Sequence, residues 1–127
     1  MDEHKVPWKV LLIDDDADIR RITQIILETE GGWSVRLAAS GEEGIAMAEA
    51  ELPDVILLDV MMPRVDGPET LARLRASPRT AAIPVVFLTA KVQKQEIARY
   101  LQIGGAAVVV KPFDPDTLGA EIAAVLT

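Results

Sequence analysis

The sequence contains no cysteine and only one histidine among its 127 residues. The absence of cysteine excludes disulfide bonds and thiolate metal sites. A single histidine cannot supply the ligands of a typical zinc site. Disulfide cross-links, thiolate metal sites and typical zinc sites are therefore excluded.

Basic residues are also scarce, with 13 Lys and Arg against 20 Asp and Glu, which gives a net charge of −7. A surface that binds nucleic acid needs clustered Lys and Arg, so we expect no direct nucleic-acid contact. No apolar run reaches the length of about 18 residues that a membrane-spanning helix needs. No signal-peptide pattern precedes Val10 either. We expect a cytoplasmic protein that does not contact a membrane.

What the chain does have is the composition of one globular domain. Hydrophobic residues make up 50% and charged residues 26% of a chain that is long enough for a single domain. Internal repeats and low-complexity linkers are absent. Apolar runs instead alternate with amphipathic stretches from one end to the other. Expected strands cover Lys9–Ile13, 33–37, 55–58, 85–88 and 108–110.

Helix signals fill the intervals between these strands. A first helix carries Ile19, Ile22 and Ile26 on one face and ends at Gly31 and Gly32. The pair Ser40 and Glu43 is typical of a capping box for a second helix that ends near residue 52. A third helix begins at 66–68, a fourth ends at 104–105, and Asp114 with Pro115 begins a fifth.

This strict alternation predicts an α/β fold with a five-stranded parallel sheet and helices on both faces. The central strands consist almost entirely of Val, Ile and Leu, as expected for strands that are covered on both sides. With right-handed crossovers in the order 2-1-3-4-5, the first and third strands are neighbours. Functional sites of such sheets lie beyond the carboxyl ends of the strands.

Chemically reactive residues close four of the expected strands. Asp59 follows the buried run 55–58, where a charge is costly unless a partner offsets it. Asp14, Asp15 and Asp16 follow the first strand, and Thr89 and Lys111 follow the fourth and fifth. Carboxylates, a hydroxyl and an ammonium group can together hold a divalent cation and a phosphoryl group.

Four short segments, in this order and at these separations, resemble the receiver domain of two-component response regulators. They are Leu12-Ile13-Asp14-Asp15-Asp16, Leu57-Leu58-Asp59-Val60-Met61-Met62-Pro63 with Asp66-Gly67, Leu88-Thr89-Ala90, and Val110-Lys111-Pro112-Phe113. The resemblance extends from Val10 to Leu126. It implies an N-terminal tail over 1–8, a receiver domain over 9–127, and a flavodoxin-like fold.

The resemblance also implies how the domain works. Asp59 would accept a phosphoryl group from a phosphohistidine on a sensor histidine kinase or a histidine phosphotransfer protein. Mg²⁺ would be held by Asp15 directly, by Asp14 mostly through water, by Asp59, and by the backbone carbonyl of Met61. The phosphoform would hydrolyse with time. Such a domain is a signalling module that acts on an output domain or a downstream protein, and it is not a turnover enzyme.

Other residues acquire expected roles from the same resemblance. Thr89 would bond a phosphoryl oxygen, and Lys111 would pair first with Asp59 and then with the phosphate. The peptide bond between Lys111 and Pro112 is expected to be cis, which X-Pro bonds allow at low cost. Met61 and Lys91 would flank the path of the hydrolytic water.

Two other functions remain as alternatives. A haloacid-dehalogenase-like phosphatase would use Asp14 as its nucleophile, together with Asp16, Thr89 and Lys111. Against it, the expected small-hydroxyl pattern after the first aspartate is missing, and no acidic pair follows Lys111. A degenerate receiver that only binds a partner is disfavoured because no active-site position is lost. Asp16 fits a helix cap better than a metal ligand.

Overall fold

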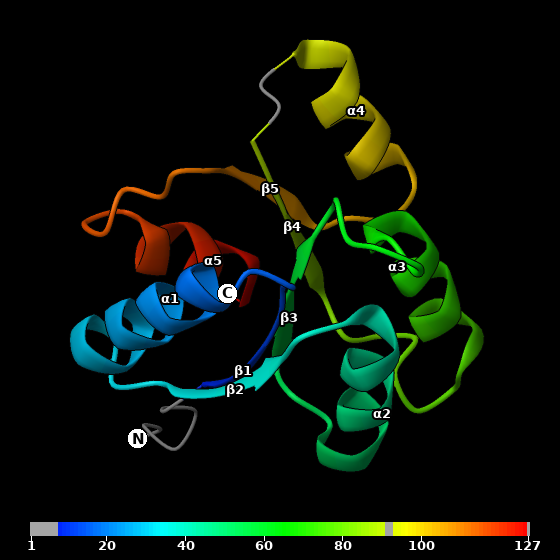
Figure 1. The fold of residues 1–127 in the computed structure, drawn as a ribbon, viewed down its shortest axis with the longest axis horizontal. Coiled ribbons are helices and arrows are strands. Elements are labelled where there is room, and N and C mark those ends of the chain that lie inside the picture. Colours follow the sequence, from blue (N-terminus) through cyan, green and yellow to red (C-terminus); the bar gives the residue numbers. More distant parts are fainter. Residues whose placement is uncertain (1–7, 91–92, 127) are drawn as a thin grey trace.

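The computed structural model describes residues 8–90 and 93–126, and their elements alternate as the sequence predicts (Figure 1). The five strands are β1 (Lys9–Ile13), β2 (Ser34–Ala38), β3 (Val55–Asp59), β4 (Val85–Thr89) and β5 (Ala107–Val110). The helices are α1 (Ala17–Glu30), α2 (Gly41–Glu51), α3 (Gly67–Ala76), α4 (Lys94–Gln102) and α5 (Leu118–Leu126).

All strand pairs are parallel, and the sheet has the predicted order β2-β1-β3-β4-β5. In this order β1 and β3 are direct neighbours, with Ile13 opposite Leu58. The residues that follow these two strands therefore meet at one edge of the sheet. Helices α1 and α5 cover one face, and α2, α3 and α4 lie on the other side (Figure 1).

Two apolar cores hold these layers together, one on each face of the sheet. The strand residues of β3 and β4 are buried along their whole length, in agreement with their Val, Ile and Leu content. Leu27 of α1 and Ile122 of α5 pack on one face, and Leu71 and Leu74 of α3 pack on the other. This double cover makes the sheet a rigid base for the loops at its carboxyl edge.

Side-chain caps fix where α1 and α2 begin. Asp16 accepts hydrogen bonds from the backbone of Asp18 and Ile19, which confirms that it caps α1. Ser40 accepts one from Glu43 N–H at 3.1 Å, as predicted for α2, although the Glu43 carboxylate bonds Ala39 N–H instead of Ser40. Such caps satisfy backbone donors that the first turn of a helix leaves free.

The apolar face expected for α1, which carries Ile19, Ile22 and Ile26, is buried only in part. Thr23, Ile26 and Leu27 are buried, whereas Ile22 is 51% exposed. Ile25 is also largely exposed, so this helix has more apolar residues than its buried stripe can accommodate.

The last helix begins later than predicted. Residues 115–117 form a turn in which Thr117 and Leu118 donate to the Asp114 carbonyl, and the regular helix begins at Leu118. Among the helices that the structure describes, none is long and apolar enough to cross a membrane.

Candidate functional site

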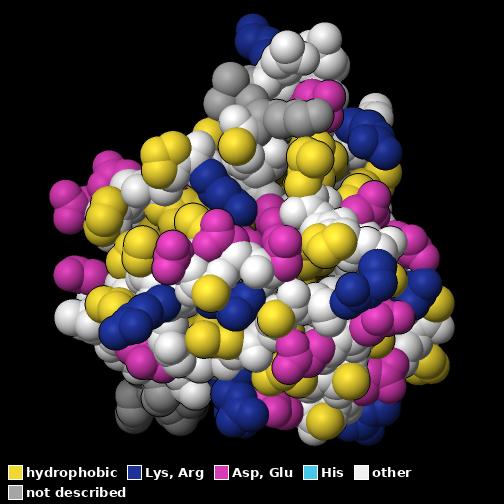
Figure 2. Space-filling model, viewed as in Figure 1, with side chains coloured by type: hydrophobic (Ala, Val, Ile, Leu, Met, Phe, Trp, Pro, Cys, Tyr) yellow, Lys and Arg dark blue, Asp and Glu magenta, His cyan; other side chains and the backbone are white. Residues whose placement is uncertain are grey.

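The carboxyl ends of β1, β3 and β4 and the loop after β5 surround a cavity of about 380 Å³. Its lining consists of Asp14, Asp15, Asp16, Asp59, Met61, Thr89, Ala90 and Lys111. Acidic side chains gather near the centre of the face shown in Figure 2, close to the point where β1 ends in Figure 1. The residues expected to hold Mg²⁺ or the phosphoryl group therefore lie together; they are Asp14, Asp15, Asp59, Met61, Thr89 and Lys111.

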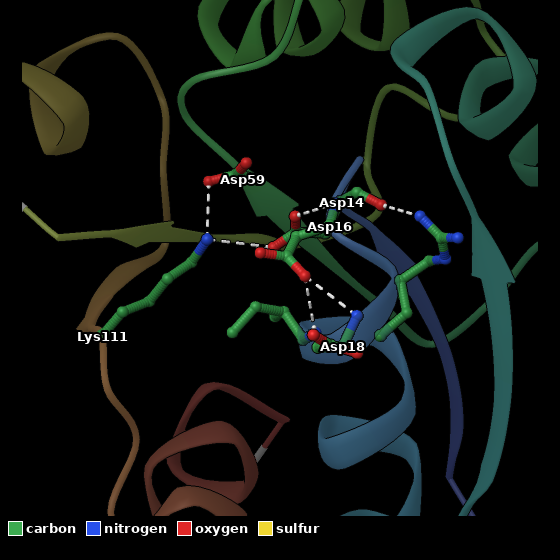
Figure 3. A network of polar contacts seen from close by, with 7 residues as sticks. Asp14, Asp16, Asp18, Asp59 and Lys111 are labelled. Atoms are coloured by element: carbon green, nitrogen blue, oxygen red, sulfur yellow. Dashed lines mark hydrogen bonds and ion pairs between the residues drawn. The ribbon is translucent and has the colours of Figure 1, made fainter.

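Lys111 joins two of the carboxylates. Its Nζ atom lies 3.0 Å from Asp14 Oδ2 and 3.0 Å from Asp59 Oδ1, although Lys111 is far from both in the sequence (Figure 3). The Lys111 side chain is only 17% exposed, and those of Asp14 and Asp59 are 0% and 8% exposed. Charge-assisted bonds of this kind offset part of the cost of burying the charges.

Three carboxylates converge on the same cavity. One oxygen each from Asp14, Asp15 and Asp59 lies within 4.8 Å of the others, which is a spacing that a metal ion can bridge. Asp14 and Asp59 are buried, whereas Asp15 is exposed. Hard oxygen donors of this type fit Mg²⁺, which binds through one or two carboxylates and retains several waters.

Burial and neighbouring charges shift the pKa values of Asp59 and Lys111. The pKa of Asp59 rises from an ordinary 3.8 to about 6, mainly because the carboxyl group is buried. The hydrogen bond from Lys111 lowers this pKa, and the charges of Asp14 and Asp15 raise it. Burial lowers the pKa of Lys111, but hydrogen bonds to Asp59 and Asp14 outweigh that effect and raise it overall.

The raised pKa makes Asp59 a source of instability at neutral pH. Below about pH 4 both the folded and unfolded chains hold its proton, and between about pH 4 and 6 only the folded chain does. Stability from this group is therefore lost as the pH rises through that window. A pKa shift of this size corresponds to a loss of at most about 3 kcal/mol in the free energy of unfolding.

We therefore expect Asp59→Asn to increase the free energy of unfolding near pH 7.5 in EDTA, by about 2 kcal/mol. The gain should disappear near pH 4, because wild-type Asp59 is then neutral as well. Urea titrations at several pH values measure it. Asp18→Asn is the control, because it removes an exposed carboxylate near the site and should show no comparable gain. Equal responses of the two variants would contradict this account of Asp59.

Asp14 is held on every side by hydrogen bonds. Its Oδ1 accepts from Asp16 N–H at 2.9 Å, and its Oδ2 accepts from Lys111. Its N–H donates to the Ala38 carbonyl, and its own carbonyl accepts from Arg20 Nη1 at 2.7 Å. A buried carboxylate with both oxygens engaged is poorly placed to attack a substrate, which weakens the case for Asp14 as a nucleophile.

Thr89 and Met61 also border the cavity. Thr89 is 2% exposed and lines the cavity, and the Met61 side chain is 65% exposed at its rim. The bond between Lys111 and Pro112 is cis, as predicted. Lys91 lies outside the described residues.

The sequence analysis did not identify Arg20, and it named Gly67 only as part of a motif. Arg20 donates a hydrogen bond to the backbone of Asp14. The only sequence feature that could have indicated this contact is the arginine six residues after that aspartate, near the start of a helix. Gly67 lies against the backbone of Asp59 and Val60, so close that no side chain fits between them. Its place directly after Asp66, the cap of α3, was the available signal.

Comparison with known proteins gives consistent matches. The family model for the response regulator receiver domain matches residues 10–123. The response regulator Rre1 of Synechocystis is 40% identical over 114 residues, which is 90% of this chain and 49% of that protein. The alkaline phosphatase synthesis transcriptional regulatory protein PhoP of Bacillus subtilis is 37% identical over 93% of this chain and 48% of its own length.

Solved structures agree with these sequence matches. The chemotaxis protein CheY4 of Vibrio cholerae superimposes with a TM-score of 0.87 at 33% identity, covering 94% of this chain and 98% of that one. The signal receiver domain of a signal transduction histidine kinase from Syntrophus aciditrophicus has a TM-score of 0.82 at 26% identity, covering 94% and 89%. The chain spans about half the length of the sequence relatives named above. These matches do not favour the phosphatase hypothesis.

Proposed function

The chain belongs to the family of response regulator receiver domains, and from this premise we propose that Asp59 accepts a phosphoryl group from a phosphohistidine beside a bound Mg²⁺. The observation that carries the proposal is the contact between Lys111 and Asp59 in a cavity that three carboxylates share. The phosphohistidine belongs to a sensor histidine kinase or a histidine phosphotransfer protein. Residues 9–127 form the receiver unit.

Asp59 acts as a carboxylate nucleophile. One of its oxygens forms a bond to phosphorus while the bond between phosphorus and the donor imidazole nitrogen breaks. The imidazole, which carries a proton on its other ring nitrogen, takes the electron pair of that bond and leaves as a neutral group. The product is an acyl phosphate. Water later cleaves it, which releases inorganic phosphate and restores the carboxylate, so the signal ends without a second protein.

The donor set supports Mg²⁺ as the cofactor. Asp15, Asp59 and the Met61 carbonyl would hold the ion directly, and Asp14 would act mostly through water. When bound, the ion offsets the repulsion among the carboxylates and neutralises charge on the transferred phosphoryl oxygens.

Lys111 and Thr89 serve the phosphoryl group from the other side of the cavity. Lys111 holds Asp59 in place before transfer and then pairs with a phosphoryl oxygen, because its ammonium already reaches the cavity. Thr89 donates its hydroxyl to another phosphoryl oxygen. In phosphoryl transfer the protein mainly positions groups and stabilises charge, and these two residues do both.

The phosphorylated domain passes its signal to an output domain or to a downstream protein. Rre1 is a response regulator and PhoP a transcriptional regulatory protein by name, and each is about twice as long as this chain. We propose an output of that general kind, with no direct contact between this domain and nucleic acid. It is a signalling domain that works in the cytoplasm.

Phosphorylation mapping tests the proposal. The domain is incubated with acetyl phosphate or phosphoramidate and Mg²⁺, the acyl phosphate is reduced with borohydride, and the modified residue is located by mass spectrometry. We expect modification of Asp59 that EDTA prevents and Asp59→Asn abolishes, while Asp18→Asn reacts as the wild type does. Modification of Asp14 would instead support a phosphatase. No modification by either donor would contradict phosphoryl acceptance.

A further inference from the structure

Arg20 makes one contact that the phosphoryl chemistry does not use. From the end of the first turn of α1, its Nη1 atom reaches back and donates to the Asp14 carbonyl oxygen at 2.7 Å. Arg20 is partly buried. A guanidinium bonded to a carbonyl at this distance makes a charge-assisted hydrogen bond, which is stronger than a neutral one.

The carbonyl that Arg20 holds belongs to the peptide group between Asp14 and Asp15. Its orientation sets the direction in which the chain leaves Asp14, and so sets where the Asp15 carboxylate lies. The N–H of Asp14 is tied to the Ala38 carbonyl at 3.1 Å, so the backbone is held on both sides of this residue. Arg20 supplies the second of these ties.

The position of the Asp15 carboxylate depends on the backbone more than the positions of the Asp14 and Asp59 carboxylates do. Lys111 bonds the carboxylates of Asp14 and Asp59, whereas the exposed Asp15 side chain makes no hydrogen bond with any described residue. Nevertheless an Asp15 oxygen lies within 4.8 Å of oxygens from the other two. The course of the chain, and not a side-chain partner, directs it into the cavity.

We propose that Arg20 is a positioning residue that orients the Asp14–Asp15 peptide so that Asp15 can share a Mg²⁺ ion with Asp59. This inference rests on the proposed function, because it concerns the same metal site. Mg²⁺ demands near-ideal octahedral geometry, so a small displacement of one carboxylate weakens its binding. Mutation of a residue that holds a metal ligand in place, without touching the metal, typically lowers the metal affinity by about 10- to 100-fold.

Coulomb attraction and positioning make opposite predictions for Arg20. Removal of a positive charge near an acidic site strengthens its attraction for a cation, so electrostatics alone predicts tighter Mg²⁺ binding without the guanidinium. Loss of positioning predicts weaker binding. The direction in which the Mg²⁺ dissociation constant changes therefore separates the two effects. A residue that only stabilises the fold would leave the Mg²⁺ affinity of the folded domain unchanged.

Calorimetric titration of the folded domain with MgCl₂ measures the dissociation constant directly. We expect Arg20→Met to weaken Mg²⁺ binding by about tenfold. Arg21→Met is the matched control, because Arg21 is exposed on the same helix, makes no side-chain hydrogen bond or ion pair with a described residue, and carries the same charge. Its affinity should stay equal to that of the wild type or become slightly tighter.

An Arg20→Met domain that binds Mg²⁺ as tightly as the wild type, or more tightly, overturns the role of Arg20. If that variant is unfolded by circular dichroism, Arg20→Gln takes its place and meets the same criterion. A wild-type domain that binds no Mg²⁺ overturns the proposed metal site and the role of Arg20 with it. Failure of the Arg20 inference alone leaves the wild-type titration intact, so the two failures are distinguishable.

Discussion

Lys111→Met is expected to lower the free energy of unfolding by about 3 kcal/mol near neutral pH, because removal of one partner leaves buried charges unpaired. The ammonium is the hydrogen-bond partner of both the Asp14 and the Asp59 carboxylates, and both are almost fully buried. Methionine conserves much of the side-chain volume but supplies no charge. Phosphorylation of Asp59 should also slow by about a hundredfold, since one preorganised donor to the phosphoryl group is lost.

The pH dependence and the response to metal identify charge as the cause. Without Lys111 the pKa of Asp59 should rise beyond about 6, so the loss of stability should shrink as the pH falls and the carboxyl group takes up its proton. Mg²⁺ should restore more stability to the variant than it adds to the wild type, because it supplies the missing positive charge. A pure packing defect would respond to neither.

Urea denaturation with and without Mg²⁺ measures these effects. Lys94→Met removes an exposed lysine at the start of α4 and is the matched control. We expect it to change stability by less than about 0.5 kcal/mol. If both variants behave alike, Lys111 does not neutralise the carboxylate cluster.

Gly67→Ala is expected to cost about 3 kcal/mol of stability by overpacking, and also to impair phosphorylation. A Cβ atom at this position would lie 2.6 Å from the Asp59 carbonyl oxygen and 2.8 Å from the Val60 Cα. These neighbours are backbone atoms at the end of a buried strand, so they cannot move aside as a flexible side chain would. The added methyl group must displace either the end of β3 that carries Asp59 or the start of α3.

Gly119→Ala provides the opposite control. Gly119 lies in α5, and a Cβ there would meet nothing within 4 Å. Alanine favours helix over glycine, so we expect this change to stabilise the domain by about 0.5 kcal/mol. Thermal denaturation and the initial rate of Asp59 phosphorylation compare the two variants. A stable, normally reactive Gly67→Ala domain would show that this close approach is not required.

The fold could be predicted in large part because its central strands give an unambiguous signal. The runs that became β3 and β4 are continuous apolar residues closed by a polar residue, and both are fully buried. The buried face of helix α1 was harder to predict, because exposed Ile22 and Ile25 widen its apolar face beyond the buried stripe. The pattern could not fix the rotation of that helix, because the buried stripe includes a polar residue, Thr23.

The positions of the site residues could be predicted from the topology of the sheet. The contacts that Arg20 and Gly67 make beside them could not. Because parallel strands end at one edge, residues after β1, β3, β4 and β5 had to lie near one another. The contact of Arg20 with the Asp14 carbonyl depends on a side-chain conformation, and the contact of Gly67 with Asp59 depends on the path of a loop. Neither leaves a periodic pattern in the sequence.

A crystal structure of the domain with Mg²⁺ and beryllofluoride is the most direct test of the central claim. We predict one ion bound by the carboxylates of Asp15 and Asp59 and by the Met61 carbonyl, with Asp14 linked through water. The fluoride atoms on Asp59 should contact Thr89 and Lys111. An ion bound elsewhere, or beryllofluoride attached to Asp14, would contradict the account.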